Sequence, residues 1–315
     1  MRVLMLTFSM LLFAVSVFAA PPQAGLGSKE PGLFNLKGSL YYLTEEDEGM
    51  PADLAQRKVQ GTLYTDRFDV PIRDFTEGFP GVSDRFEWFG LVYTGTFQVP
   101  KDGAFTWRME SDDGSMLWID GKEVIANDGV HATQSAQGDT ELKAGPHTMK
   151  VWFFQGPAQQ LGIQLWVTPA GKDERIFAMG DFASGLSAAL NKVKAVATPD
   201  GIKVELDAAI LFDSAKWDLK PAGKGAMTAL AEVIKAYPGC TVRVEGHTDN
   251  VGADEANNQL SKQRADSVVT ALGKAGVGAD VKFQAAGFGS SRPVAKNDKE
   301  SGRAKNRRVE LFIKP

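Results

Sequence analysis

The sequence predicts two domains, an all-β sandwich followed by an α/β sandwich with the element order βαβαββ. Three observations predict this. The chain has 315 residues, a length typical of two domains. Strand-type alternation dominates the first half, whereas strand and helix patterns alternate in the second. Residues 1–189 hold 15 Lys+Arg and 24 Asp+Glu, a net charge of −9, and residues 190–315 carry +5, which fits two modules with separate tasks.

Residues 1–19 have the features of a secretory signal peptide. Arg2 supplies the positive end, residues 4–18 are almost wholly apolar, and small residues precede a cleavage site after Ala19. The apolar run is short for a spanning helix, although a retained N-terminal anchor is the alternative. No later segment approaches 18 consecutive apolar residues. We therefore expect an exported mature chain without a transmembrane segment, beginning with a short segment over residues 20–31.

Residues 32–169 are expected to form the β-sandwich. Phe105, Trp107 and Met109 alternate with polar residues and so share one strand face. Asp120-Gly121 is a strong hairpin signal between two such runs. Alternation returns at residues 149–153 and 161–167. Many short strands with little helix are typical of a sandwich.

This half resembles the protective-antigen-type module, the PA-fourteen domain. The resemblance is carried by these segments: Phe79-Pro80-Gly81-Val82, Glu87-Trp88-Phe89-Gly90, Ser111-Asp112-Asp113-Gly114-Ser115 and Leu117-Trp118-Ile119-Asp120-Gly121. It implies a β-sandwich of a kind found in adhesins, glycosidases and toxins, of which many members bind carbohydrate. Some sugar-binding members hold Ca²⁺ with the adjacent aspartates, here Asp112 and Asp113. The alternative is a turn capped by aspartate side chains. Four tryptophans are candidates for sugar stacking or for the core: Trp88, Trp118, Trp152 and Trp166.

Residues 170–199 lose the strand pattern and are expected to form a linker with a short helix carrying Leu186, Leu190 and Val193. The second domain, residues 200–315, should contain strands over 202–212, 240–245, 281–286 and 308–313. Helices should start at Pro221 and near Asn257, on one face of a mixed sheet. Cys240, the single cysteine, is expected to be a buried, inert thiol.

The most informative stretch is Gly246-His247-Thr248-Asp249-Asn250, at the end of an expected strand. Arg264 follows fifteen residues after Asp249, on the next expected helix. A carboxylate and a guanidinium in one groove can hold a zwitterion, since the aspartate takes an ammonium and the arginine takes a carboxylate. A lone pair at this spacing is usually an ion pair on a solvated face. His247, a single histidine after a strand, is typical of a structural residue.

Residues 200–315 resemble the OmpA-like C-terminal domain shared by OmpA, peptidoglycan-associated lipoprotein and MotB. The matching positions include Ile210-Leu211-Phe212-Asp213, Gly246 to Asn250, Leu260-Ser261, Arg264-Ala265 and Asn306-Arg307-Arg308-Val309-Glu310. The resemblance implies non-covalent binding of meso-diaminopimelate in peptidoglycan stem peptides. Asp249 would receive the ligand amine and Arg264 its carboxylate. The other implied site residues are Thr248 and Asn257 lining the pocket, Arg308 bracing it, and Phe212 and Asp213 at the edge of the groove.

The resulting hypothesis is a non-enzymatic peptidoglycan-binding protein of the periplasm or outer membrane of a diderm bacterium, with no resident cofactor. Its sandwich is expected to be a carbohydrate-binding module. A calcium-dependent glycan-binding adhesin is the main alternative. A cell-wall hydrolase is disfavoured because the three histidines show no metal spacing and no nucleophilic triad is evident. Nucleic acid is disfavoured because the basic cluster at 303–308 lacks interleaved aromatic residues.

Overall fold

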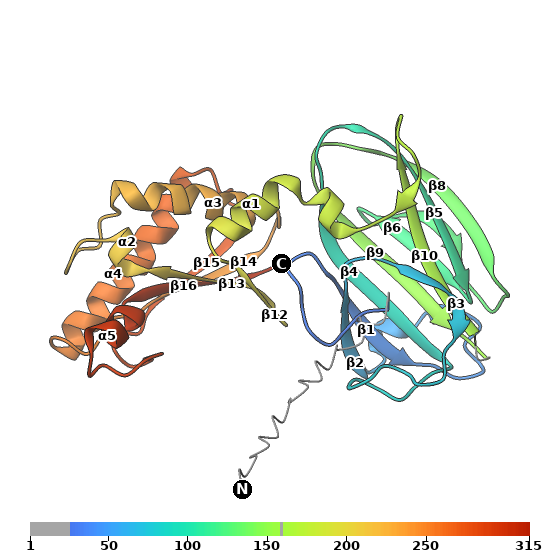
Figure 1. Ribbon diagram of the computed structural model, residues 1–315, viewed down its shortest axis with the longest axis horizontal. Helices are drawn as coiled ribbons and strands as arrows, with labels where there is room; N and C mark the ends of the chain where they lie inside the picture. Colours follow the sequence, from blue (N-terminus) through green and yellow to red (C-terminus); the bar gives the residue numbers. More distant parts are fainter. Residues whose placement is uncertain (1–25, 158–159) are drawn as a thin grey trace, which may run out of the picture.

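The computed structural model describes residues 26–157 and 160–315, and Figure 1 shows them as a strand-rich body and a smaller body with helices against a sheet. The two-domain prediction is confirmed. The expected signal peptide over residues 1–19 and the residues up to 25 lie outside the described part of the chain.

The first body is a sandwich of two sheets. One sheet has the strand order β2-β1-β4-β9-β6-β7, and the other has the order β11-β10-β5-β8, with β3 also paired to β10. The strands of the first sheet are β1 (Leu36–Tyr42), β2 (Gly61–Thr65), β4 (Phe89–Val99), β6 (Ser115–Ile119), β7 (Lys122–Asn127) and β9 (Gly145–Gln155). Those of the second are β3 (Asp69–Asp74), β5 (Gly103–Asp112), β8 (Gln134–Leu142), β10 (Gln160–Pro169) and β11 (Arg175–Ile176).

The alternation read from the sequence places the core of the sandwich correctly. Phe105, Trp107 and Met109 on β5 are buried and pack against apolar residues of the facing sheet. The hairpin predicted at Asp120-Gly121 joins β6 to β7, and both of its residues have positive φ angles, 51° and 75°. Such a turn matches the twist of the flanking strands.

The second body is a five-stranded mixed sheet with the order β12-β13-β16-β14-β15, in which only the β14–β15 pairing is parallel. Figure 1 shows its long helices lying along one face. Its strands are β12 (Val196–Thr198), β13 (Gly201–Asp207), β14 (Thr241–Gly246), β15 (Lys282–Gly287) and β16 (Arg308–Lys314). Its helices are α1 (Ser184–Lys192), α2 (Ala208–Leu211), α3 (Lys224–Lys235), α4 (Asp254–Lys274) and α5 (Glu300–Asn306). Short 3₁₀ turns also occur among the described residues, at Leu54–Gln56 in the sandwich, at Met179–Phe182 in the linker and at Pro221–Gly223 before α3.

The strand expected over residues 202–212 is shorter in the structure. It ends at Asp207, whose carboxylate accepts a hydrogen bond from the backbone N–H of Ala209 at 2.7 Å and so caps the one-turn helix α2. The capping bond satisfies an amide that a strand would have paired with a neighbour. As a result, Phe212 lies in a separate short bridge with Leu219 rather than in the main sheet.

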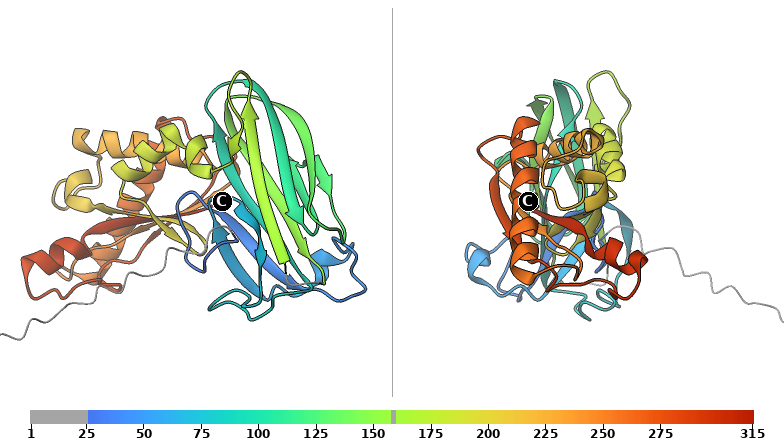
Figure 2. Two further views of the ribbon diagram at one scale, coloured as in Figure 1. Left: turned by 45° about the vertical axis from the view of Figure 1, so that its right-hand side comes forward. Right: turned by 90° about the vertical axis from the view of Figure 1, so that its left-hand side faces the viewer.

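The two bodies contact each other at the turn between β12 and β13 and at the end of α3. Lys37 Nζ and the Tyr64 hydroxyl both donate to the carbonyl of Pro199 at 3.2 Å, and Gln98 Nε2 donates to the carbonyl of Ala236 at 3.1 Å. In the left view of Figure 2, the yellow-green helix α1 lies between the sandwich and the other helices. Within residues 26–157 and 160–315, no helix combines the length and apolar composition needed to cross a bilayer.

Candidate functional site

The candidate site lies where β14 ends and α4 passes over the sheet. Two glycines let the helix approach closely. A Cβ at Gly246 would lie 2.0 Å from the carbonyl oxygen of Ser261, and one at Gly287 would lie 2.3 Å from the backbone nitrogen of Lys262. Residues larger than glycine would push α4 away from β14 and β15. Acidic residues in the first turn of α4 and Lys274 in its last turn suit the helix dipole.

Asp249 follows β14 and is buried, with 7% of its surface exposed. One carboxylate oxygen accepts from the backbone N–H of Val251 at 3.0 Å, and the other accepts from Arg307 Nη1 at 2.6 Å. Arg307 also pairs with Glu300 through its second amino group at 2.5 Å. The pKa of Arg307 is raised, mainly by its hydrogen bonds to Glu300 and then Asp249. The buried Asp249 carboxylate is thus paired with Arg307, which is also paired with Glu300.

Arg264, on α4, is also buried, with 5% of its surface exposed. Its Nε donates to the carbonyl of Lys216 at 3.0 Å and its Nη2 to the carbonyl of Asp213 at 3.4 Å. The guanidinium carbon lies 5.2 Å from the ring centre of Phe212. Among the described residues, Nη1 has no hydrogen-bond partner and no carboxylate forms an ion pair with Arg264. A guanidinium with one amino group unused can bind a further acceptor.

The charges of Arg307 and Asp249 both act on the Arg264 guanidinium. Burial lowers the pKa of Arg264, the positive charge of Arg307 lowers it further, and the negative charge of Asp249 opposes both effects. The carboxylate and the guanidinium are therefore brought into one region without forming a direct ion pair. This is the arrangement that a zwitterionic ligand requires.

Thr248 and Asn257 shape the same region through the backbone. Thr248 is buried and donates its hydroxyl to the carbonyl of Asp249 at 2.9 Å. Asn257, in the second turn of α4, donates to the carbonyl of Val251 at 3.1 Å and, more distantly, to that of Asp249 at 3.5 Å. Asn257 thus ties the 249–251 loop to α4, whereas the Thr248 hydroxyl bond lies within the loop. The side chain of Asp213 is exposed, and among the described residues it ion-pairs with Lys216 and Lys220, so its contact with Arg264 is through its carbonyl.

Arg308 lies elsewhere, and Arg307 takes the position next to Asp249. Val309, Leu311 and Ile313 of β16 are packed in the core under the helices, so the alternating residues point to the opposite face of the sheet. There Arg308 donates to Glu310 at 3.1 Å and to the carbonyl of Arg292 at 3.2 Å. The strand alternation could have indicated this, since Arg308 precedes the buried Val309 by one residue.

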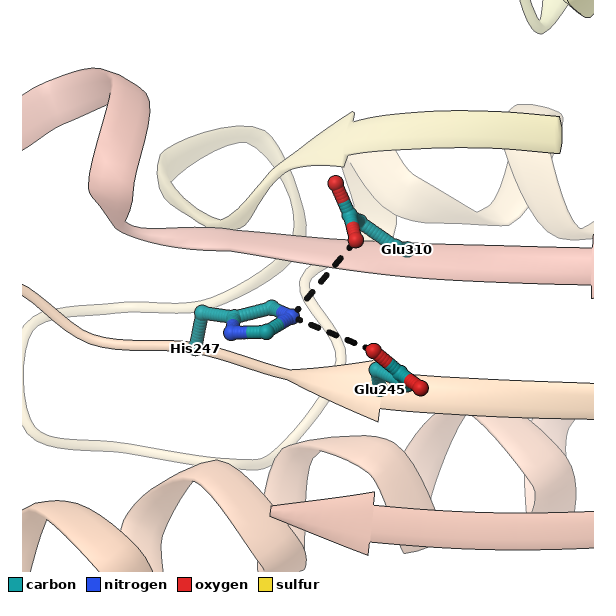
Figure 3. Close-up of side chains that lie close together, drawn as sticks. All are labelled: Glu245, His247 and Glu310. Atoms are coloured by element: carbon teal, nitrogen blue, oxygen red, sulfur yellow. Dashed lines mark ion pairs between the residues drawn. The ribbon is translucent and has the colours of Figure 1, made fainter. Parts of the chain in front are cut away.

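On that opposite face, Glu245, His247 and Glu310 bring three metal-ligand types together, with ligand atoms within 4.8 Å of one another. Figure 3 shows the His247 ring pointing between the two carboxylates, with Nε2 3.8 Å from Glu245 and 3.7 Å from Glu310. Each carboxylate is already matched by two cations: Arg243 and Arg292 pair with Glu245, and Lys203 and Arg308 pair with Glu310.

The charge balance at this cluster opposes a divalent cation. Burial lowers the pKa of His247 to about 4, and the positive charge of Arg308 lowers it next. The four cations around the two carboxylates already exceed their negative charge, so a divalent cation would add to a positive excess. His247 stacks on Phe288 at 5.6 Å, while both of its ring nitrogens lack hydrogen-bond partners. We interpret the cluster as an ion-pair network around a neutral histidine.

In the sandwich, Asp112 and Asp113 differ in their surroundings. Asp113 is buried and accepts from the backbone N–H groups of His131 at 3.0 Å and Gly156 at 2.8 Å. Burial raises its pKa, although these two bonds oppose the shift. Asp112 accepts from the Thr133 hydroxyl at 3.1 Å. Neither forms an ion pair with a described residue, in contrast to Glu245 and Glu310.

The four candidate sugar-stacking tryptophans contact other side chains of the sandwich. Trp152 is fully buried and donates to Asp128 at 2.9 Å. Trp166 is half-buried under the Arg108 guanidinium, at 3.7 Å from the ring centre, and Trp118 lies under Lys150 at 4.2 Å. Trp88 stacks edge-on against Phe154 with ring centres 6.3 Å apart.

Comparison with known proteins identifies both domains. Residues 211–307 match the model of the OmpA family, and residues 69–177 match that of the PA14 domain. The order and type of the two modules agree with the resemblances read from the sequence.

Three curated relatives match the C-terminal part. They are the "Probable lipoprotein YiaD" of Escherichia coli K12 (42% identical over 116 residues, 37% of this chain and 52% of the relative), the "Outer-membrane lipoprotein YfiB" of Pseudomonas aeruginosa (35% over 114 residues, 36% and 67%), and the "Peptidoglycan-binding protein ArfA" of Mycobacterium bovis (39% over 104 residues, 33% and 32%). The chain thus spans about half the length of YiaD and a third of ArfA.

Proposed function

Because this chain belongs to the OmpA family and carries a PA14 domain before its OmpA domain, we propose that it is a non-enzymatic envelope protein that binds peptidoglycan. The OmpA domain would hold the diaminopimelate residue of a stem peptide, and the PA14 domain would bind glycan. The relatives named above support the envelope setting, since one is an outer-membrane lipoprotein and another a peptidoglycan-binding protein.

The observation that carries this proposal is the separation of the two buried charges. Asp249 and Arg264 lie in one region without neutralising each other, and Arg264 keeps Nη1 unused. The side chain of diaminopimelate ends in an ammonium and a carboxylate on one carbon. The carboxylate would bind the guanidinium of Arg264, and the ammonium would bind Asp249.

The pairing of Arg307 would allow the ligand ammonium to replace it at Asp249. Arg307 contacts Asp249 in the structure, yet its second amino group is paired with Glu300. When a ligand ammonium takes over the Asp249 carboxylate, Arg307 keeps an anionic partner. The exchange therefore replaces one charge-assisted hydrogen bond with another and leaves no buried charge unpaired.

Sedimentation with purified diderm sacculi tests the proposal. We expect the wild-type chain to sediment with the sacculi, and the Asp249→Asn and Arg264→Ala variants to remain in solution. The matched control is Glu232→Gln with Lys305→Ala, which changes one acid and one base at exposed positions of the same domain. Circular dichroism establishes that each variant folds. Folded site variants that sediment like the control would refute the proposal.

A second proposal concerns calcium at Asp112 and Asp113. Asp112 and Asp113 are adjacent carboxylates that form no ion pair with a described residue, and Asp113 is buried with a raised pKa, so a cation would stabilise them. Calcium prefers six to eight oxygen ligands, so backbone carbonyls and water would complete the shell. Bound Ca²⁺ would fix the loop that carries these residues for glycan binding. We expect CaCl₂ to raise the melting temperature of the wild-type chain but not of an Asp112→Asn, Asp113→Asn variant; equal melting temperatures with CaCl₂ and EDTA would contradict the proposal.

A further inference from the structure

A groove beside the candidate site is unused by the proposed contacts to diaminopimelate. It has a volume of about 750 Å³ and lies between the loop at residues 217–219, the start of α3 and the second half of α4. This volume falls within the range of about 300–1,000 Å³ that small-ligand sites usually have. We call it the Trp217 groove. Its lining includes Trp217, Leu219, Met227, Thr228, Gln263 and Ser267.

The lining combines one exposed aromatic ring with neutral polar groups. Trp217 is 43% exposed, which is unusual for so large an apolar side chain. Hydroxyl and amide groups of Thr228, Gln263 and Ser267 surround it. The charged residues of the groove balance, with Asp218 and Asp266 against Lys224 and Lys274. A neutral ligand with an apolar face and hydroxyl edges fits this combination, and a pyranose ring has both.

Two segments that line the groove also contact or carry Arg264. Gln263, in its lining, precedes Arg264 on α4, and the Arg264 guanidinium holds the carbonyl of Lys216, the residue before Trp217. The hydrogen bond therefore fixes the loop that presents the indole ring. Along α4, Ser267 lies three residues from Arg264, or about 4.5 Å of helix rise. The stem-peptide residues between diaminopimelate and the sugar each span up to about 3.5 Å when extended, so the sugar would lie away from the charged pair, towards neighbouring surface such as this groove.

We propose that the Trp217 groove binds a pyranose ring of the glycan strand that carries the bound stem peptide. This inference rests on the proposed function, because the peptide bound at Asp249 and Arg264 would deliver the sugar. The indole ring stacks on the apolar face of the sugar, and the surrounding hydroxyl and amide groups bind its hydroxyls. The OmpA domain would thus recognise the junction between peptide and glycan rather than a free peptide.

Titration with two ligands tests the inference. One is the diaminopimelate tripeptide, and the other is the same tripeptide attached to its disaccharide. We expect the wild-type chain to bind the sugar-bearing ligand about 10-fold more tightly. Trp217→Ala should remove this difference and leave the affinity for the sugar-free tripeptide unchanged. Ile210→Ala, at an exposed apolar position outside the groove, is the control and should keep the difference.

A second variant blocks the groove without altering the aromatic ring. Ser267→Lys should also abolish the preference for the sugar-bearing ligand. The inference is overturned if the wild-type chain binds both ligands equally or if Trp217→Ala keeps the preference. Binding of neither ligand would refute the proposed function instead, and titration with the peptide-free disaccharide would then decide the groove: a fluorescence shift lost in Trp217→Ala supports it, and no shift overturns it.

Discussion

Replacing Arg264 with lysine tests the role of the guanidinium while preserving its charge. In the structure, Nε and Nη2 hold two backbone carbonyls, and Nη1 remains for a ligand carboxylate. A lysine ammonium is a point charge and cannot hold both the loop and the ligand in the same planar geometry. The variant should therefore lose one charge-assisted hydrogen bond to the ligand, worth roughly 1.5–3 kcal/mol.

This loss corresponds to a dissociation constant roughly 10- to 150-fold higher for the diaminopimelate tripeptide. Isothermal titration calorimetry measures it, and thermal unfolding shows whether the variant is folded. Arg108→Lys is the matched control, because Arg108 also makes two short hydrogen bonds, both to Glu174 at 2.8 Å, but in the other domain. A folded Arg264→Lys chain that binds the tripeptide within twofold of wild type would refute the assignment.

Three further predictions concern stability and reactivity. The side chain of Asn306 accepts from the N–H groups of Val294 and Ala295 and donates to the Ala295 carbonyl and to Asn297. Asn306→Ala should therefore lower the free energy of unfolding by about 3 kcal/mol in urea titrations, and a Lys305→Ala control, at an exposed position, should change it little. The pKa of His247 is about 4 in the folded chain and about 6.5 in the unfolded chain, so the unfolded chain takes up the proton first as the pH falls. The stability that comes from the neutral histidine is therefore present above pH 6.5 and is lost as the pH falls towards 4, a loss of roughly 3 kcal/mol. In His247→Gln, the free energy of unfolding should depend less on pH across this range. Burial raises the pKa of Cys240 to about 11, so a thiol reagent at pH 8 should label it only after denaturant unfolds the chain; rapid labelling of the native protein would contradict this.

The sequence predicted the parts of the fold that depend on periodic burial. Alternation placed Phe105, Trp107 and Met109 in the core, because a strand with one buried face repeats every second residue. The helix after Pro221 buries Met227, Leu230 and Ile234 as its spacing indicated. Local polar contacts were harder to foresee. Asp207 was read as part of a strand, although an aspartate before two alanines is also a helix-capping signal.

The sequence indicated the positions of Asp249 and Arg264 in the fold, but not that Arg307 rather than Arg308 contacts Asp249. The motif places Asp249 at a strand end, and the close approach of α4 at Gly246 brings Arg264 near it. Which arginine contacts Asp249 depends on the turn before β16, where no periodic pattern fixes a side-chain direction. Arg307 lies in that turn and contacts Asp249, whereas Arg308 is the first residue of β16, so its side chain follows the alternation of the strand. The unused Trp217 groove was also invisible in the sequence, because its lining comes from three separate segments.

The most direct test of diaminopimelate recognition compares two tripeptides that differ by one carboxylate. One carries diaminopimelate at the third position, and the other carries lysine. Because Arg264 would bind that carboxylate through a charge-assisted hydrogen bond, the wild-type chain should bind the diaminopimelate peptide at least about 10-fold more tightly, and Arg264→Ala should bind both weakly and equally. Equal affinities of the wild-type chain for the two peptides would contradict the account.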